Sequence, residues 1–305
     1  MLNRFNFERS IGAVVLGMVL LVAGCDTGGS GSSSMQGRAE ADSVAATAAQ
    51  QAEQATAVSD AAQIALQQAV ISERLPYGEV HDQLVYGHFV FPADMVEPLP
   101  AVIVIHDWWG LNDSVRTRAD RLAAEGFIVL AVDLFAGETA TSVGAANQHM
   151  LRVVENPEIA QENISKAYDF LNGVAGAPRI ASLGWGFGGS WALNTALLFV
   201  DDLDAAVLYY APISIDEEEL RTINVPILGH FGSSDKGISV ATVRNFEDAL
   251  ERLRKNYDIR IYPGAGQGFA DPGGDSYNAK AEEQAWQATL EFFSRNLSTA
   301  AADVE

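Results

Sequence analysis

Residues 179–196, RIASLGWGFGGSWALNTA, constrain the fold of this chain more than any other stretch. They join a short apolar run to the glycine-rich turn G-W-G-F-G-G and then to a helical pattern. A strand that turns this sharply into a helix forms a nucleophile elbow, which lifts the side chain at its tip into a pocket. The tip here is Gly186, which has no side chain to present. The stretch therefore predicts a fold and leaves the chemistry open.

Strands and helices alternate along the chain after residue 80, which predicts a mostly parallel, doubly wound α/β sheet covered by helices on both faces. Unbroken apolar runs predict buried strands at 100–107, 127–133, 179–183, 204–210, 225–231 and 258–262. Helical patterns occur at 113–125, 158–173, 188–200, 240–256 and 281–296. Residues 80–91 alternate and predict an antiparallel pair at the sheet edge. Ligands bind at the carboxyl ends of the strands in such sheets.

Residues 1–24 have the features of a bacterial lipoprotein signal peptide. Two arginines precede an apolar run at 11–22, which is short for a membrane span, and the segment ends in L-V-A-G-C, which resembles a lipobox. Cys25 is the only cysteine of the chain. We expect it to carry a lipid anchor that holds the protein in the cell envelope, facing the periplasm, and Asp26 after it favours the inner membrane. An ordinary signal peptide or a short anchor helix is the alternative.

Three further segments are predicted around the domain. Residues 25–41 are rich in Gly and Ser and predict a flexible tether. Residues 42–75 are rich in Ala and Gln and predict a helical spacer, whose alanine face (residues 42–73) is suited to a protein partner but lacks the large side chains of a coiled coil. The domain is expected at 76–298, with a disordered tail at 299–305.

The charge of the chain excludes some partners. Forty acidic against 19 basic residues give a formal net charge of -21, which disfavours nucleic acid and anionic lipid headgroups as ligands. No histidine pair has metal-ligand spacing, so we predict no metal and no cofactor. With Cys25 committed to the anchor, no thiol remains for a disulfide or for a nucleophile.

Four blocks, in order along the chain, resemble the motifs of the dienelactone hydrolase family. They are HDWWGLN at 106–112, GWGFGG at 184–189, FGSSD at 231–235 and YPGAGQGF at 262–269. The resemblance covers about residues 80–296 and implies the α/β-hydrolase fold, with a Cys nucleophile, an acid and a His that hydrolyse esters or lactones. In this chemistry the His accepts and returns a proton, the acid orients it, and two backbone amides stabilise the oxyanion.

Matched to the family's motifs, the chain keeps the frame of the site and loses its reagents. Gly186 stands at the nucleophile position and Gln267 at the base position, whereas Asp235 matches the acid. The backbone amides of Trp108 and Phe187 match the oxyanion-hole donors. Glycine has no nucleophilic atom and an amide cannot shuttle a proton, and loss of either reagent costs on the order of 10⁴-fold in rate. The triad is therefore degenerate.

Five more residues fall on loops that the fold brings to the mouth of the site. They are His106, Asp107, Trp109, Trp185 and Phe269. Asp107 matches an acidic residue that is usually Glu in the family. An apolar cleft lined by rings suits a small organic ligand; core packing is the alternative for Trp185 and Phe269.

Other serine and histidine residues in the motifs could in principle replace the missing nucleophile or base, but each also has a structural interpretation. Ser190 lies one helical turn past the elbow and suits close packing, while Ser233 and Ser234 suit a turn. His106 and His230 each end a buried strand, where a hydrogen-bonded structural histidine is the main interpretation and a base acting on water the other. Asp235 either keeps the role of an acid or hydrogen-bonds the Gln267 amide.

Two functional hypotheses follow from the motifs, and a third has less support in the sequence. In the first, the domain no longer hydrolyses by the family's route and binds a small apolar or acyl ligand, or a protein. In the second, it is an active carboxylic ester or lactone hydrolase that uses a displaced base and water. A purely structural lipoprotein is the third, and it rests on the alanine-rich helix alone.

Overall fold

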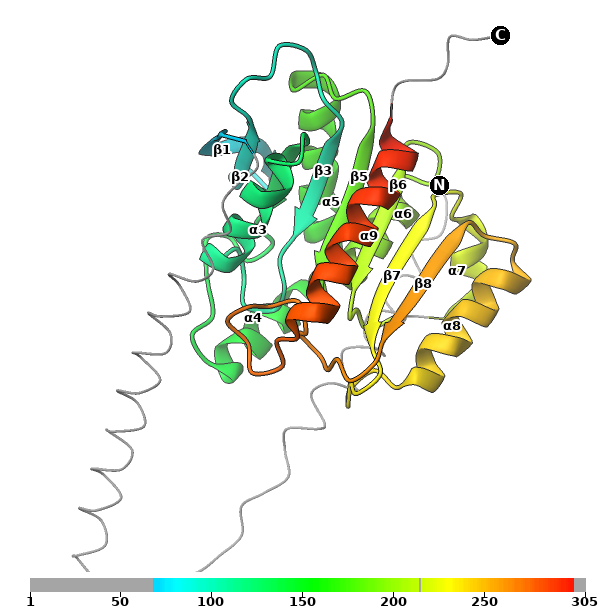
Figure 1. Ribbon diagram of the computed structural model, residues 1–305. Coiled ribbons are helices and arrows are strands. Elements are labelled where there is room, and N and C mark those ends of the chain that lie inside the picture. Colours follow the sequence, from blue (N-terminus) through cyan, green and yellow to red (C-terminus); the bar gives the residue numbers. More distant parts are fainter. Residues whose placement is uncertain (1–67, 214, 299–305) are drawn as a thin grey trace, which may run out of the picture.

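Short apolar strands build the centre of the sheet. β3 (Ala101–Ile105), β4 (Ile128–Val132) and β6 (Ala205–Tyr209) are buried at every position. The remaining strands are β1 (Val70–Val80), β2 (Gln83–Pro92), β5 (Ile180–Trp185), β7 (Ile227–Gly232) and β8 (Tyr257–Tyr262). The computed structural model describes residues 68–213 and 215–298, and within them the eight strands form one sheet in the order β1-β2-β4-β3-β5-β6-β7-β8 (Figure 1).

The sheet is parallel from β4 to β8 and antiparallel at its N-terminal edge. β1 pairs antiparallel with β2, and β2 pairs antiparallel with β4. The other neighbouring pairs are parallel. The α/β-hydrolase architecture with an antiparallel edge pair is thereby confirmed.

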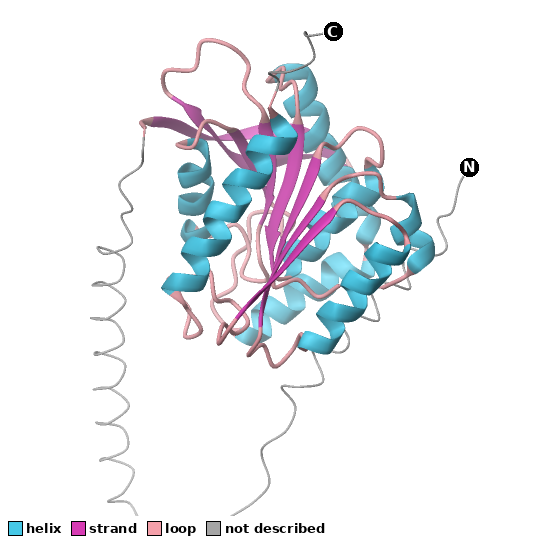
Figure 2. Cartoon of the chain, turned by 45° about the vertical axis from the view of Figure 1, so that its right-hand side comes forward, coloured by secondary structure: helices cyan, strands magenta, loops and turns pink. Residues whose placement is uncertain are grey.

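Helices cover both faces of the sheet (Figure 2). They are α3 (Asp113–Ala123), α4 (Val143–Glu155), α5 (Pro157–Asp169), α6 (Phe187–Leu198), α7 (Glu217–Thr222), α8 (Val240–Arg252) and α9 (Ala279–Leu297), with one π-helical turn, η1 (Phe170–Val174). The core on one face packs buried side chains of α4 to α8 against the strands, and the core on the other packs α3 and α9. Alternate residues of β3 enter the two cores, since successive strand side chains point to opposite faces.

The predicted spacer boundary at residue 75 is wrong. The last six residues of that segment belong to β1, which starts at Val70 and pairs with β2 along its length. Val70 and Ile71 are β-branched, and cross-strand pairing outweighs the local helix propensity of the preceding alanines. The rest of the spacer, the signal peptide, the tether and the tail 299–305 lie outside the described residues.

Smaller differences concern turns and helix ends. The antiparallel edge pair exists, but residues 80–91, predicted to hold both of its strands, supply mainly β2; the partner is β1, and the hairpin turns at His81 and Asp82, both at positive φ (47° and 61°). Asn112 caps α3, because its side chain accepts from the Val115 amide, and Asp113 is the first residue of the helix. Helix α7 lacks a sequence prediction. None of the helices in the described part of the chain has the length and apolar character that a bilayer crossing requires.

Close backbone contacts at the turn between β5 and α6 pack the start of α6 against the ends of β5 and β3. A Cβ on Gly184 would lie 2.1 Å from the carbonyl oxygen of Gly188, and one on Gly188 would lie 2.2 Å from that of Ile105. No real Cβ tolerates such distances, so the first turn of α6 rests directly on the end of β3.

We expect Gly188→Ala to lower the free energy of unfolding by about 3 kcal/mol, because its methyl group overlaps backbone atoms that cannot move independently. Urea denaturation measures the change. Gly144→Ala in α4 is the control, since nothing lies within 4 Å of its Cβ and Ala favours the helix. Equal stability of the two variants would contradict the close approach.

Candidate functional site

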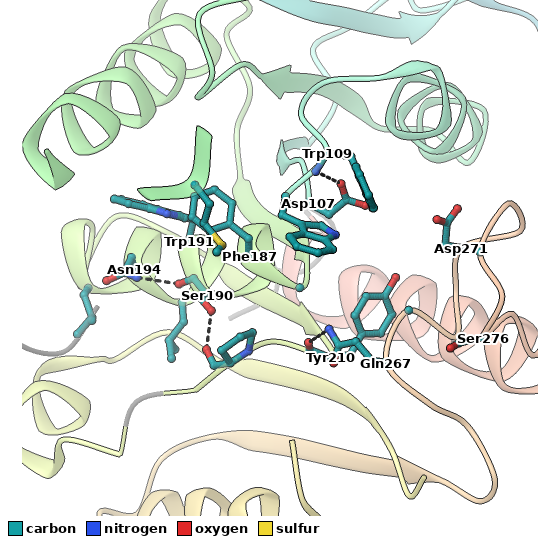
Figure 3. Close-up of a pocket in the computed structure, with 18 of the residues that line it drawn as sticks. Asp107, Trp109, Phe187, Ser190, Trp191, Asn194, Tyr210, Gln267, Asp271 and Ser276 are labelled. Carbon is teal, nitrogen blue, oxygen red and sulfur yellow. Dashed lines mark hydrogen bonds between the residues drawn. The ribbon is translucent and has the colours of Figure 1, made fainter. Parts of the chain in front are cut away.

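The candidate site is a pocket of about 390 Å³ at the carboxyl ends of the strands (Figure 3). Its walls come from the loop after β3, the elbow and α6, the segment from β6 to α7, and the loop between β8 and α9. The lining residues among the predicted ones are Asp107, Trp108, Trp109, Gly186, Phe187, Ser190 and Gln267. The pocket therefore lies where parallel sheets place their ligands.

The elbow keeps its strained backbone without a side chain. Gly186 has φ 54° and ψ -115°, a conformation that L residues rarely adopt. A Cβ placed on it meets a single neighbour within 4 Å, the Nε2 atom of Gln267 at 3.7 Å. The positions of the family's nucleophile and base thus face each other across the pocket, and neither holds a group that can react.

Gln267 is held by the backbone of the neighbouring strand end. Its Nε2 donates to the carbonyl oxygen of Tyr210 at 3.1 Å. Its Oε1 is buried and has no hydrogen-bond partner among the described residues. The amide therefore presents an N–H group, and not a lone pair, toward the space over Gly186.

Asp235 does not reach the pocket. One of its oxygens accepts from the amides of Gly237 (2.8 Å) and Ile238 (2.9 Å), and the other, Oδ2, is buried without a partner in the described part of the chain. Burial raises the pKa of this carboxyl, and the two amide donors oppose the rise. The alternative hydrogen bond between Asp235 and the Gln267 amide is not present among the described residues: Nε2 of Gln267 donates to Tyr210, and Oδ2 of Asp235 has no partner. Asp235 serves the turn after β7.

The two backbone amides predicted for an oxyanion hole, those of Trp108 and Phe187, belong to residues that line the pocket. Trp108 follows β3 and Phe187 opens α6. Neither amide donates a hydrogen bond to another residue within the ranges that the structure describes. The first amides of a helix are unpaired by construction and favour negative charge. These donors suit a carbonyl oxygen of a ligand.

Asp107 lines the pocket beside these amides. Its Oδ1 accepts from the Trp109 amide at 2.9 Å, and its Oδ2 lies 4.0 Å from Nη2 of Arg118. Burial raises the pKa of Asp107, and the charge of Arg118 opposes the rise. Its side chain is 13% exposed.

Three residues predicted for the pocket lie outside its lining. His106 is fully buried, with Nδ1 2.7 Å from the carbonyl oxygen of Asp107 and Nε2 accepting from the Leu134 amide at 3.0 Å. Trp185 points into the core on the α3 and α9 face, where the Arg118 guanidinium lies 4.4 Å from its ring centre. Phe269 is buried in the same core. Alternation along the strand ends decides the directions of His106 and Trp185, whereas the path of the loop after β8 places Phe269.

Neither strand-end histidine can serve as a displaced base. Burial lowers the pKa of His106, and both of its nitrogens are engaged. His230 lies between the hydroxyls of Tyr262 (2.9 Å) and Thr289 (3.0 Å), and burial lowers its pKa to about 3. Both are structural histidines.

Several lining residues were missed by the sequence reasoning. They are Met150, Trp191, Leu193, Asn194, Leu197, Tyr210, Pro212, Glu219, Leu220, Gly268, Asp271, Gly274, Asp275 and Ser276. Most come from α6, α7 and the last loop, whose paths depend on packing. Arg118 does not line the pocket but lies within 4.0 Å of the Asp107 and Asp271 carboxylates. The sequence could have indicated it, since a charged residue on the apolar face of α3, between Val115 and Leu122, needs a buried partner. Within residues 68–213 and 215–298, no three acidic, His or Cys side chains form a metal-binding group.

The pKa of Asp235 predicts a pH-dependent stability. Because burial raises its pKa, the folded state holds the proton more tightly than the unfolded state, and stability falls as pH rises from about 4 through the folded pKa. Asp235→Asn removes this loss. We expect the unfolding free energy of the variant relative to the parent to increase between pH 4.5 and 7.5, as measured by urea denaturation. Asp248→Asn, an exposed change on α8, should show no such trend; a decrease for Asp235→Asn would refute the assignment.

Comparison with known proteins finds relatives that match about two thirds of this chain. The chain is 29% identical over 242 residues to a "Putative carboxymethylenebutenolidase" of Saccharolobus solfataricus, covering 67% of this chain and 93% of that one. It is 27% identical over 206 residues to a "Probable 2-oxo-3-(5-oxofuran-2-ylidene)propanoate lactonase" of Bradyrhizobium sp, covering 63% and 82%.

Among solved structures, the fold is similar to a dienelactone hydrolase-like promiscuous phosphotriesterase, P91, from metagenomic libraries. The TM-score is 0.69 at 23% identity, covering 75% of this chain and all of that one. The model of the dienelactone hydrolase family matches residues 86–297, more than half of the chain. The chain belongs to the dienelactone hydrolase family.

Proposed function

We propose that this family member binds a small, largely apolar or acyl ligand in the pocket and does not hydrolyse it by the Cys-Asp-His route. One observation carries the proposal. The space where a nucleophile side chain would stand faces an amide, Nε2 of Gln267, at 3.7 Å. With nucleophile and base both absent, the oxyanion-hole amides and the binding contacts are the parts of the machinery that remain.

The lining of the pocket supports a binding role. Apolar and aromatic side chains dominate the end formed by α6, including Phe187, Trp191 and Leu197. Two polar residues at that end are satisfied within the protein, since the Ser190 hydroxyl donates to the Pro212 carbonyl oxygen and the Asn194 amide donates to that of Ser190. A pocket of this size, with few polar groups, suits a small organic molecule.

A second candidate is hydrolysis of an ester or lactone by water, with Asp107 as the base. The observation in its favour is that Asp107 lines the pocket next to Trp108 and has a raised pKa. In this reaction water attacks the acyl carbon, Asp107 takes its proton, the oxyanion rests on the two amides, and the proton passes to the leaving alkoxide. The reactions named for the relatives, of a lactone and of phosphotriesters, belong to those proteins.

We expect the full chain to hydrolyse p-nitrophenyl acetate and simple lactones no faster than buffer. The double variant Gly186→Cys with Gln267→His should gain esterase activity, because the two positions face each other, and its thiol should react with iodoacetamide. Each single variant is the matched control and should gain little, since a thiol without a base, or a base without a thiol, lacks half of the route.

Turnover by the parent chain would instead favour the second candidate if Asp107→Asn abolished it. A folded double variant whose thiol stayed unreactive would contradict our placement of the site.

We also propose that the chain is a lipoprotein anchored at Cys25, with the pocket on the periplasmic side. The L-V-A-G-C sequence at 21–25 supports this. In a Gram-negative host, Cys25→Ser should move the protein out of the membrane fraction and abolish labelling by an alkyne-bearing palmitate, whereas Ser30→Ala in the following segment should change neither. Unaltered fractionation of Cys25→Ser would refute the anchor.

A further inference from the structure

The charges that line the pocket all have one sign. Four carboxylates line it, those of Asp107, Glu219, Asp271 and Asp275. No Lys, Arg or His is present among the described residues of the lining. The chain as a whole carries a formal charge of -21, so the field around the molecule points the same way.

Three of these carboxylates belong to one end of the pocket. Figure 3 shows Asp107, Trp109, Asp271 and Ser276 on one side and Phe187, Trp191 and Asn194 on the other. Asp275 precedes Ser276 in the last loop and is exposed. The pocket therefore has an acidic end at the loops and an apolar end at α6.

One positively charged side chain, that of Arg118, lies close to two of the carboxylates. Nη2 of Arg118 lies 4.0 Å from Asp107 and 3.7 Å from Asp271, and its side chain is 10% exposed. The Asp271 carboxylate also accepts from the hydroxyl of Ser114 at 3.2 Å. A single guanidinium shared between two carboxylates leaves one negative charge at this end, and Asp275 adds another. The acidic end is therefore not neutralised from within.

Aromatic rings stand beside these charges. The rings of Trp108 and Trp109 lie 4.9 Å apart at 56°, and both residues are half-buried in the lining. Tyr210 lines the opposite side of the same space. Ring faces attract ammonium groups, and rings combined with carboxylates are the usual receptor for a substituted ammonium ion.

We propose that the occupant of the pocket is an organic cation: an alkylammonium or quaternary ammonium head lies between the tryptophans and Asp107 and Asp271, and its apolar chain runs toward α6. This inference rests on the proposed binding function and adds the charge of the ligand. It sets the chain apart from the Bradyrhizobium relative, whose named substrate is a propanoate and hence an anion. Four carboxylates would repel such a molecule.

The test compares three probes that share one chain and differ in the head: octyltrimethylammonium, octanol and octanoate. Binding to the full chain is measured by tryptophan fluorescence and by calorimetry, below the micelle concentration. We expect the cation to bind about tenfold or more tighter than octanoate, and 0.5 M salt to weaken the cation alone.

Variants locate the effect. Asp271→Asn and Asp275→Asn should each weaken the cation about three- to tenfold and leave octanol unchanged. Asp271 accepts hydrogen bonds from Ser114 and Gly273, whereas the Asp275 side chain makes no hydrogen bond within the described residues, so Asp275→Asn is the decisive variant if the loop is disturbed in Asp271→Asn. The matched control is Asp248→Asn, which removes the same charge from the exposed surface of α8 and should change neither probe.

The outcomes separate the two proposals. Binding of octanol and octanoate as tight as that of the cation would overturn the inference about charge and leave the binding function standing. Absence of binding by all three probes would count against the binding function itself. Tight cation binding that Asp271→Asn and Asp275→Asn leave intact would place the cation elsewhere and also overturn the inference.

Discussion

The contact of backbone on backbone at the elbow is the constraint on which the site depends. Glycines at 184 and 188 allow the first turn of α6 to rest on the end of β3, at distances that no Cβ permits. This contact brings the loop after β3 and the start of α6, which are far apart in sequence, to one place, and both Trp108 and Phe187 line the pocket there. The contact involves backbone atoms, so it does not require a reactive side chain at position 186.

Glycine is favoured at position 186 for a different physical reason than at positions 184 and 188. Its Cβ position is open, and only the backbone conformation, φ 54° with ψ -115°, favours glycine. A side chain at such a position costs on the order of 1–3 kcal/mol, which an enzyme accepts for the sake of its nucleophile. Once the nucleophile has no role, glycine removes that strain. Among the described residues, neither Oδ2 of Asp235 nor Oε1 of Gln267 has a hydrogen-bond partner, so these two side chains do not bond to each other through these oxygens.

The groups that remain around the pocket favour recognition over covalent chemistry. Both strand-end histidines are buried and hydrogen-bonded, with lowered pKa values, so they act as packing elements between strands and helices. Asp107 is a titratable group in the lining of the pocket, next to Trp108. Hydrolysis by water would need its carboxylate as a base, whereas ligand binding would not. The carboxylates of Asp107 and Asp271 form the acidic end of the pocket, and the paired rings of Trp108 and Trp109 line the same pocket.

The sequence by itself determined the alternating architecture, the antiparallel edge, the elbow turn and the residues that stand at the motif positions, Gly186 and Gln267 among them, because these depend on local patterns and on motifs of fixed spacing. It did not determine the start of β1, since pairing with β2 overrides the helix propensity before it. Tertiary structure alone decided that His106 and Trp185 are buried, because a residue at a strand end can point to either face of the sheet, and that Phe269, in the loop after β8, packs into the core on the α3 and α9 face. It also decided that Asp271 and Asp275, from the last loop, stand with Asp107, since only the folded sheet brings the carboxyl ends of β3 and β8 to one mouth.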